Sequence, residues 1–141
     1  RASLNQPSVT LAVVDGDTSS IIAKTAFPKA KLLSLPQDTP LSHLLLTVST
    51  GKADATFVEN IIADDYVSNN PNSVQDLFPN QPLRIFGNTI LVTKDEDGFL
   101  NFLNTSLGEL INDGSAERLI QKYAHSSRAL LPPSKPYFLP N

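Results

Sequence analysis

The sequence predicts an α/β fold, built as a mostly parallel, doubly wound sheet of about five strands with helices on both faces. Short apolar runs alternate with stretches of helical period along most of the 141 residues, and this alternation indicates a parallel sheet. The first run, residues 9–14 (VTLAVV), is apolar at nearly every position, which is typical of a strand covered on both faces. Gly or Pro stands after several of these runs, where the chain has to turn.

The first strand is predicted to lead into a short helix and a second strand. Residues 1–8 are a polar lead-in, and the strand over 9–14 is followed by an Asp-Gly pair. Residues 17–19 (Asp-Thr-Ser) are all good helix N-caps, so a helix is predicted from there to about Phe27, before a proline. The run KLLSL at 31–35 predicts the second strand.

The middle of the chain predicts a second helix, a third strand and a third helix. Residues 38–40 (Asp-Thr-Pro) are a strong helix start, because a capping residue precedes a proline at the first helical position. Gly51 is expected to end this helix, and a strand over 53–58 and a helix over 59–69 follow. The apolar face of the second helix has the spacing i, i+3, i+4 and i+7, at Leu41, Leu44, Leu45 and Val48.

The second half of the chain is predicted to begin with a loop. Residues 70–82 are rich in Asn, Pro, Ser and Gln, and two further strands are predicted at 83–86 and 89–93. Two helices are predicted at 99–111 and 116–124. The first of them has a strong apolar face, formed by Phe99, Phe102, Leu103, Leu107 and Leu110.

Composition excludes several classes of function. A net charge of −3, from 11 basic and 14 acidic side chains, argues against a nucleic-acid-binding protein. The absence of Cys excludes disulfide scaffolds and thiol catalysis, and with only His43 and His125 no metal site and no cofactor are expected. No apolar run approaches the roughly 20 residues of a membrane span. The chain begins at Arg1 without Met, so we interpret it as a processed or excised piece of a longer protein.

Five stretches of the chain share their order and spacing with a known family. They are VTLAVVDGDTSS (9–20), FPKAKLL (27–33), GKADATFVEN (51–60), NTILVTKDED (88–97) and NFLNTSLGELINDGSAERLIQKYA (101–124). In these stretches the chain resembles the bacterial extracellular solute-binding proteins of family 3, which have the type II periplasmic-binding fold. Together the stretches cover most of residues 9–124.

The resemblance implies that the chain is part of a two-lobed protein. Residues 9–96 would form the second lobe and 97–124 the helices that return to the first lobe, whose N-terminal part is missing. Such proteins close two lobes around a small polar solute such as an amino acid, here on a hinge near 89–94, and deliver it from the periplasm to the membrane subunits of an ABC importer. The helices over 97–124 would lack their cover, so we expect the Pro-rich tail, 125–141, or a second copy in a homo-oligomer to bury their apolar face.

One candidate site lies in the turn after the first strand. Ligands of open α/β sheets bind at the carboxyl ends of the strands, and the backbone N–H groups and hydroxyls of Thr18 and Ser19 at such an end could bind a carboxylate. The resemblance implies that Thr18 serves the carboxylate of an amino-acid ligand. Asp17 departs from the Ser or Thr usual in the family and would repel an anion. The alternative is that Asp17 and Thr18 only cap a helix.

A second candidate, Glu59, follows the third strand. The resemblance implies that its carboxylate pairs with the α-amino group of the ligand, because a desolvated ammonium needs an opposite charge. The alternative is a surface Glu at the start of a helix, favoured by the helix dipole. Asn60 is a weaker candidate, and Asp54 is expected to be structural, bonding backbone in the turn into the strand. A sheet that starts in the order 2-1-3 would bring Thr18 and Glu59 together.

Two other functions stay open from the sequence. The same lobe could be the ligand-input (sensor) domain of a membrane receptor. An enzyme of this fold, similar to periplasmic cyclohexadienyl dehydratase, would use Glu59 for proton transfer, but no second catalytic group is identifiable, so no enzymatic activity is expected. We expect His43 to be a solvated or core-edge residue, and the PSKP motif at 133–136 to pack on the body rather than bind a polyproline-recognising partner.

Overall fold

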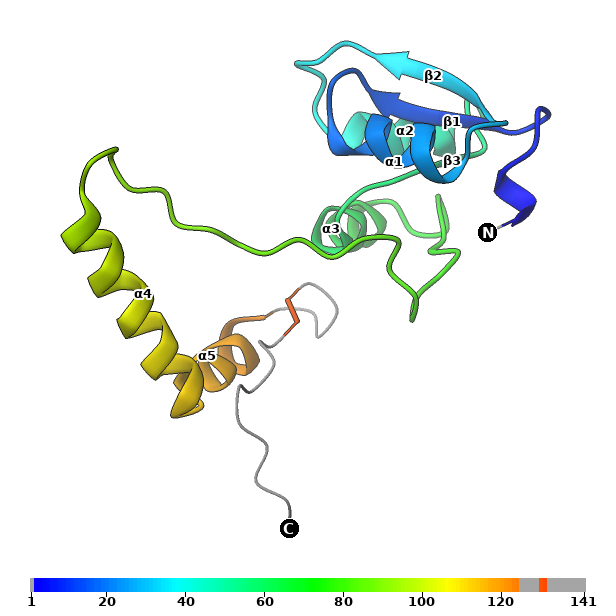
Figure 1. Cartoon of the computed structure of the whole chain (residues 1–141). Coiled ribbons are helices and arrows are strands. Elements are labelled where there is room, and N and C mark those ends of the chain that lie inside the picture. Colours follow the sequence, from blue (N-terminus) through cyan, green and yellow to red (C-terminus); the bar gives the residue numbers. More distant parts are fainter. Residues whose placement is uncertain (1, 125–129, 132–141) are drawn as a thin grey trace. The chain divides into compact units, whose positions relative to one another are not determined.

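The structure is a computed structural model that describes residues 2–124 and 130–131 (Figure 1). The chain divides into two compact units, Arg1–Arg84 and Ile85–Asn141. The predicted tail, with His125 and the PSKP motif, lies outside the described residues except for 130–131. The elements in chain order are a 3₁₀ helix (Ala2–Leu4), β1 (Thr10–Val14), α1 (Thr18–Ala26), β2 (Lys31–Leu35), α2 (Ser42–Ser49), β3 (Ala55–Thr56), α3 (Asn60–Asn69), α4 (Asp97–Asn112) and α5 (Ser115–Tyr123).

The first unit contains a parallel sheet with β1 at its centre. Its strand order is β2-β1-β3, which confirms the α/β class and the predicted 2-1-3 start (Figure 1). β1 pairs along its whole length with β2 and at two positions, Leu11↔Ala55 and Ala12↔Thr56, with β3. Within the described residues the sheet has three strands, so the prediction of about five was wrong. β3 is also shorter than the predicted 53–58.

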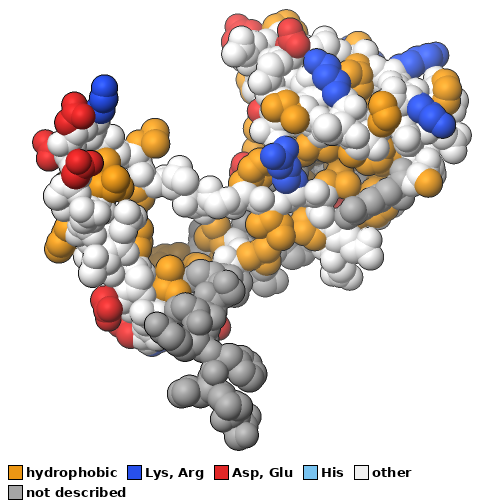
Figure 2. Space-filling model, viewed as in Figure 1, with side chains coloured by type: hydrophobic (Ala, Val, Ile, Leu, Met, Phe, Trp, Pro, Cys, Tyr) orange, Lys and Arg blue, Asp and Glu red, His pale blue; other side chains and the backbone are white. Residues whose placement is uncertain are grey.

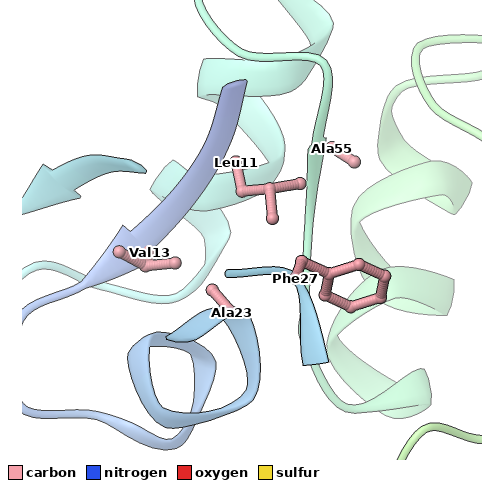
Figure 3. Packing of buried hydrophobic residues seen from close by; sticks show 5 residues of the cluster. All are labelled: Leu11, Val13, Ala23, Phe27 and Ala55. Carbon is pink, nitrogen blue, oxygen red and sulfur yellow. The ribbon is translucent and has the colours of Figure 1, made fainter. Parts of the chain in front are cut away.

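Helices cover both faces of this sheet, as predicted, and each face has its own core. The side chains of a strand alternate between its faces, so neighbouring residues of β1 enter different clusters. On the α1 face the cluster consists of Leu11, Val13, Ala23, Phe27 and Ala55 (Figure 3). On the α2 face it consists of Ala12, Val14, Leu44 and Ala53. β1 is buried on both sides because it is the strand that the two cores share.

Aromatic stacking extends the core on the α1 face toward β3. Phe27, directly after α1, is 2% exposed. Its ring stacks on that of Phe57, with 5.4 Å between the centroids and 13° between the planes. Leu83, in the segment after α3, is also partly buried against this cluster. The two Phe rings therefore tie the end of α1 to the segment that follows β3.

The apolar face predicted for α2 is confirmed, whereas its predicted start is wrong. Leu44 and Leu45 are buried, and the partly buried Leu41 and Val48 pack against the cluster on this face. The helix begins at Ser42 rather than at the predicted Asp-Thr-Pro sequence of 38–40. A separate turn uses those residues, because the N–H of Thr39 donates to the carbonyl of Pro36. Gly51 has φ +72°, the left-handed conformation expected after the helix.

The strands predicted at 83–86 and 89–93 are absent from the structure, although both segments have strand-forming residues. Ile90 is 60% exposed and Leu91 is 91% exposed. β-propensity measures how well a side chain packs against neighbouring strands, and in the described part of the chain neither segment joins the sheet of β1, β2 and β3. The apolar composition of the segments was therefore insufficient to make them strands.

The second unit contains the helices α4 and α5, close to the ranges predicted for them. Gly114 between them has φ +75°, and the Asp113 carboxylate accepts a hydrogen bond from the Ser115 N–H at 2.7 Å. No residue of either helix is buried, and Phe99 and Phe102 are 52% and 64% exposed. Figure 2 shows acidic side chains around the start of α4. The expected cover of this apolar face is not supplied by any described residue and stays a prediction.

Among the described residues, no helix combines the length and the apolar character needed to cross a bilayer.

Candidate functional site

The two predicted halves of the site follow neighbouring strands. The turn with Thr18 comes after β1, and Glu59 comes after β3, which lies beside β1 in parallel orientation. The register that pairs Ala12 with Thr56 would, if continued, bring Glu59 level with Asp15. Adjacent strands lie about 4.8 Å apart. The topology therefore brings both candidates to the carboxyl edge of the sheet.

The turn after β1 requires the glycine that the sequence places there. Gly16 has φ +75°, a conformation that residues with a Cβ rarely adopt. The Asp17 N–H donates to the carbonyl of Val14 at 3.2 Å, which closes the turn directly at the end of β1. The chain then enters α1 with extended backbone at Asp17. The N-terminus of α1 is thus held next to the end of the central strand.

Asp17 caps α1, as the structural alternative for this residue predicted. Its carboxylate accepts hydrogen bonds from the backbone N–H of Ser19 at 3.4 Å and from the Ser19 hydroxyl at 3.2 Å. The carboxylate is half-buried and is held by these contacts at the start of the helix. Asp17 therefore has a structural role, and its negative charge stands at the candidate site.

Ser19 is turned inward, contrary to the expectation that its hydroxyl could bind a ligand carboxylate. The residue is 2% exposed, and its Oγ accepts a hydrogen bond from the Val14 N–H at 3.1 Å while donating to Asp17. Both functions of the hydroxyl are used inside the fold. This orientation was not predictable from the sequence, because a serine at this position suits an N-cap as well as a buried bridge to the preceding strand.

Thr18 is placed differently from its two neighbours. It is the first residue of α1 and is half-buried. Its side chain makes no hydrogen bond with any other residue that the structure describes. Of the three predicted residues in this turn, Thr18 therefore has the hydroxyl that is available for a ligand.

Glu59 is exposed and occupies the N-cap position of α3. Its carbonyl accepts hydrogen bonds from the N–H groups of Ile62 and Ala63, but its carboxylate makes no capping hydrogen bond. The helix start is thus formed by the Glu59 backbone alone. Asn60 is the first residue of α3 and is half-buried beside it.

Asp54 has the structural role predicted for it. Its carboxylate accepts a hydrogen bond from the Thr10 N–H at 2.7 Å, and its own N–H donates to the Thr10 carbonyl at 2.8 Å. These contacts lie at the amino end of the sheet, opposite the candidate site. Asp54 is therefore separate from the candidate site.

The sequence reasoning missed two acids, Asp15 and Asp38, which follow β1 and β2 at the same edge as Asp17 and Glu59. No Lys or Arg occurs in the segments that follow the three strands, 15–20, 36–40 and 57–60. The Lys residues of this unit lie elsewhere: Lys24 in the last turn of α1, Lys29 and Lys31 before and at the start of β2, and Lys52 after α2. The carboxyl edge is thus a region of negative charge. The acids in the short segments that follow the strands were the signal that would have found it.

Two shallow depressions of the first unit include neither Thr18 nor Glu59. One of about 300 Å³ lies beside Asn5 and Phe27, and one of about 350 Å³ lies between β2 and α2, where Thr39, His43 and Lys52 line it. Among the described residues no group of three His, Cys, Asp or Glu side chains could hold a metal ion.

Comparison with known proteins gives no assignment. No protein-family model matches the chain, and no curated protein matches it significantly.

Proposed function

We propose that the chain is the second lobe of a solute-binding protein and contributes half of a site for an amino acid or a similar small polar solute. The observation that supports the proposal most is the adjacency of β1 and β3, which brings the Thr18 turn and Glu59 to one edge of the sheet. Carboxyl edges of parallel strands are the usual ligand sites of open α/β sheets.

The chemistry of the two residues suits the two ends of an α-amino acid. The hydroxyl of Thr18 can donate to a carboxylate. The N–H of Ser19 is used by the Asp17 carboxylate, and that of Ser20 by the Asp17 carbonyl, so the hydroxyl is the donor on which the proposal depends. The exposed carboxylate of Glu59 can pair with an ammonium group. Asp15 and Asp17 add negative charge beside them, so a solute with net positive charge fits this edge better than an acidic one.

The exposure of Glu59 agrees with a site that needs a second surface. A small ligand is usually enclosed over most of its surface, and neither of the two depressions described above includes Thr18 or Glu59. In the proposed function a first lobe closes over the ligand, and the complete protein delivers it to an importer in the membrane. The 141-residue chain alone should bind its solute weakly.

The experiment is a titration of the ¹⁵N-labelled 141-residue chain with a panel of amino acids, followed by amide chemical shifts. We expect non-saturating shifts confined to residues 16–20 and 58–61, and smaller ones in Glu59→Gln. Asp64→Asn, an exposed acid on α3, is the matched control and should leave the shifts unchanged. Shifts spread over the surface, or equal in Glu59→Gln and the wild type, would contradict the proposed site.

A further inference from the structure

The segment 88–93 (NTILVT) contains Leu91, the most exposed large apolar side chain among the described residues. Leu91 is 91% exposed and Ile90 is 60% exposed. No backbone hydrogen bond joins residues 87–92 to another residue that the structure describes. The segment has no charge, no Pro and no Gly, and three of its residues are aliphatic. Such an uncharged, strand-forming stretch with unpaired backbone is a template for pairing with another chain.

We propose that the 88–93 segments of two copies of this chain pair as antiparallel strands centred on Leu91. This inference does not rest on the proposed function. The occupant is a second copy because the sequence of the segment is complementary to itself. With Leu91 opposite Leu91, Ile90 lies opposite Val92 and Thr89 opposite Thr93. Aliphatic side chains then lie opposite aliphatic ones, and the two threonines lie opposite each other. Such cross-strand pairs are stabilising.

The charges that follow the segment select the antiparallel orientation. In a parallel pair in register, Lys94 would lie opposite Lys94 and Asp95 opposite Asp95, and like charges placed directly opposite are destabilising. In the antiparallel pair centred on Leu91, Lys94 lies opposite Asn88 and Asp95 opposite Gly87. The repulsion is thereby removed, and aliphatic residues still lie opposite aliphatic residues.

The helix that follows the segment supplies the surface that a two-stranded ribbon needs. An isolated pair of strands is only marginally stable in water unless it packs on a further element. Phe99 and Phe102 of α4 are largely exposed, and residues 98–108 of this helix are uncharged. Charge depletion around exposed aromatic residues is typical of the core of an interface. We therefore place α4 of each copy in the same interface as the paired strands.

The chain contains no Cys, so single-cysteine variants report on the pairing without interference. Under mild oxidation, Leu91→Cys should form a disulfide-linked dimer. Thr89→Cys alone should stay monomeric, because position 89 lies four residues, roughly 13 Å, along the strand from its counterpart in the partner. A mixture of Thr89→Cys and Thr93→Cys should form the mixed dimer, since these positions lie opposite each other. Non-reducing gels and sedimentation velocity measure the products.

A charge exchange tests the same register without cross-linking. Leu91→Lys and Leu91→Glu should each sediment as monomers at concentrations where the wild type associates, and an equimolar mixture should recover the association. The same exchange at Leu46, which is 47% exposed on α2, should leave the association unchanged. Circular dichroism verifies that each variant is folded.

Three outcomes would overturn the proposal. Equal self-cross-linking of Leu91→Cys and Thr89→Cys would indicate a parallel pair or a fibrillar stack. Association that is unchanged in Leu91→Lys would place the interface elsewhere. A wild-type chain that is monomeric throughout the accessible concentration range, with Leu91→Cys uncross-linked, would show that the segments do not pair.

Discussion

Asp54 and Thr10 hold the starts of β3 and β1 together by two hydrogen bonds in opposite directions. The Thr10 N–H donates to the Asp54 carboxylate at 2.7 Å, and the Asp54 N–H donates to the Thr10 carbonyl at 2.8 Å. β3 pairs with β1 at only two ladder positions. The contacts of Asp54 therefore form a large share of what fastens this short strand to the sheet.

Replacing Asp54 by Ala should lower the free energy of unfolding by about 1–2 kcal/mol. Hydrogen bonds to charged groups contribute roughly 1.5–3 kcal/mol, and the exposure of this carboxylate reduces the effect. Urea denaturation measures the change. Asp64→Ala, at an exposed position of α3, is the control and should stay within roughly 0.5 kcal/mol of the wild type. Equal effects of the two substitutions would show that the contact with Thr10 has no energetic importance.

Ser19→Ala should destabilise the chain by about 1–3 kcal/mol. The substitution leaves the buried N–H of Val14 without its acceptor and removes a donor from the Asp17 carboxylate. Ser68→Ala provides the comparison, because the Ser68 hydroxyl donates only to a carbonyl of its own exposed helix turn. Ser19→Thr should not rescue the effect, because an added methyl group has no room at a position that is 2% exposed. A neutral Ser19→Ala would contradict the structural role of this hydroxyl.

Phe27→Ala should be among the most destabilising single substitutions, costing roughly 3–5 kcal/mol. Phe27 is 2% exposed and belongs to the cluster on the α1 face. Phe57→Leu should cost less, because Phe57 is only half-buried and leucine keeps most of the apolar contact while losing the ring stacking. Thermal unfolding followed by circular dichroism ranks the two variants, and the reverse order would contradict the packing.

The start of α5 should respond to acid through Asp113. Hydrogen bonds from the Ser115 backbone and side chain, with a smaller contribution from Arg118, lower the pKa of Asp113 below its ordinary value of 3.8. A carboxylate whose pKa is lower in the folded chain stabilises that state at pH values above its unfolded pKa. This contribution is lost as the pH falls through the folded pKa. The amide shift of Ser115 should therefore titrate with a midpoint below 3.8. In Asp113→Asn this transition should be absent, and a wild-type midpoint above 3.8 would contradict the hydrogen bonding.

Lysine and arginine should perturb the amides of the Thr18 turn more than glutamate does at equal concentration. The edge carries Asp15, Asp17 and Glu59, and the segments that follow the strands contain no Lys or Arg. Because these charges are partly exposed, the preference should weaken as salt rises toward 0.15 M, where the Debye length is about 8 Å. A preference for glutamate, or one unaffected by salt, would contradict this account of the edge.

The sheet and its helices were predictable where one residue pattern had one physical explanation. Residues 9–14 are apolar at almost every position because β1 is buried on both faces, and Asp17 caps α1 as its position before the helix predicted. The absence of strands at 83–86 and 89–93 was not predictable from composition. A strand requires a partner strand, and the segment's own sequence does not show whether one is present. The start of α2 was misplaced because a proline turn and a proline at a helix start have similar sequences.

The candidate site was predictable in its location but not in the orientation of its side chains. The order β2-β1-β3 is that expected of a doubly wound sheet of the kind that the resemblance implies, and it brings Thr18 and Glu59 to one edge. Whether a hydroxyl at the start of a helix points outward or toward the preceding strand depends on packing. Thr18 and Ser19 are adjacent and chemically similar, yet only Ser19 bonds to the end of β1. The negative charge of the edge comes from acids that no single motif contains.

The shortness of β3 also has a consequence for local unfolding. β1 and β2 share a ladder five residues long, whereas β3 contributes two ladder residues. A local opening in which β3 leaves β1 breaks few hydrogen bonds, so it requires less free energy than global unfolding. The amide of Asp54 should then exchange its hydrogen with solvent sooner than those of the β1–β2 ladder. Glu59 follows this labile strand, whereas Thr18 follows the most protected one, so the two halves of the proposed site belong to cooperative units of different stability.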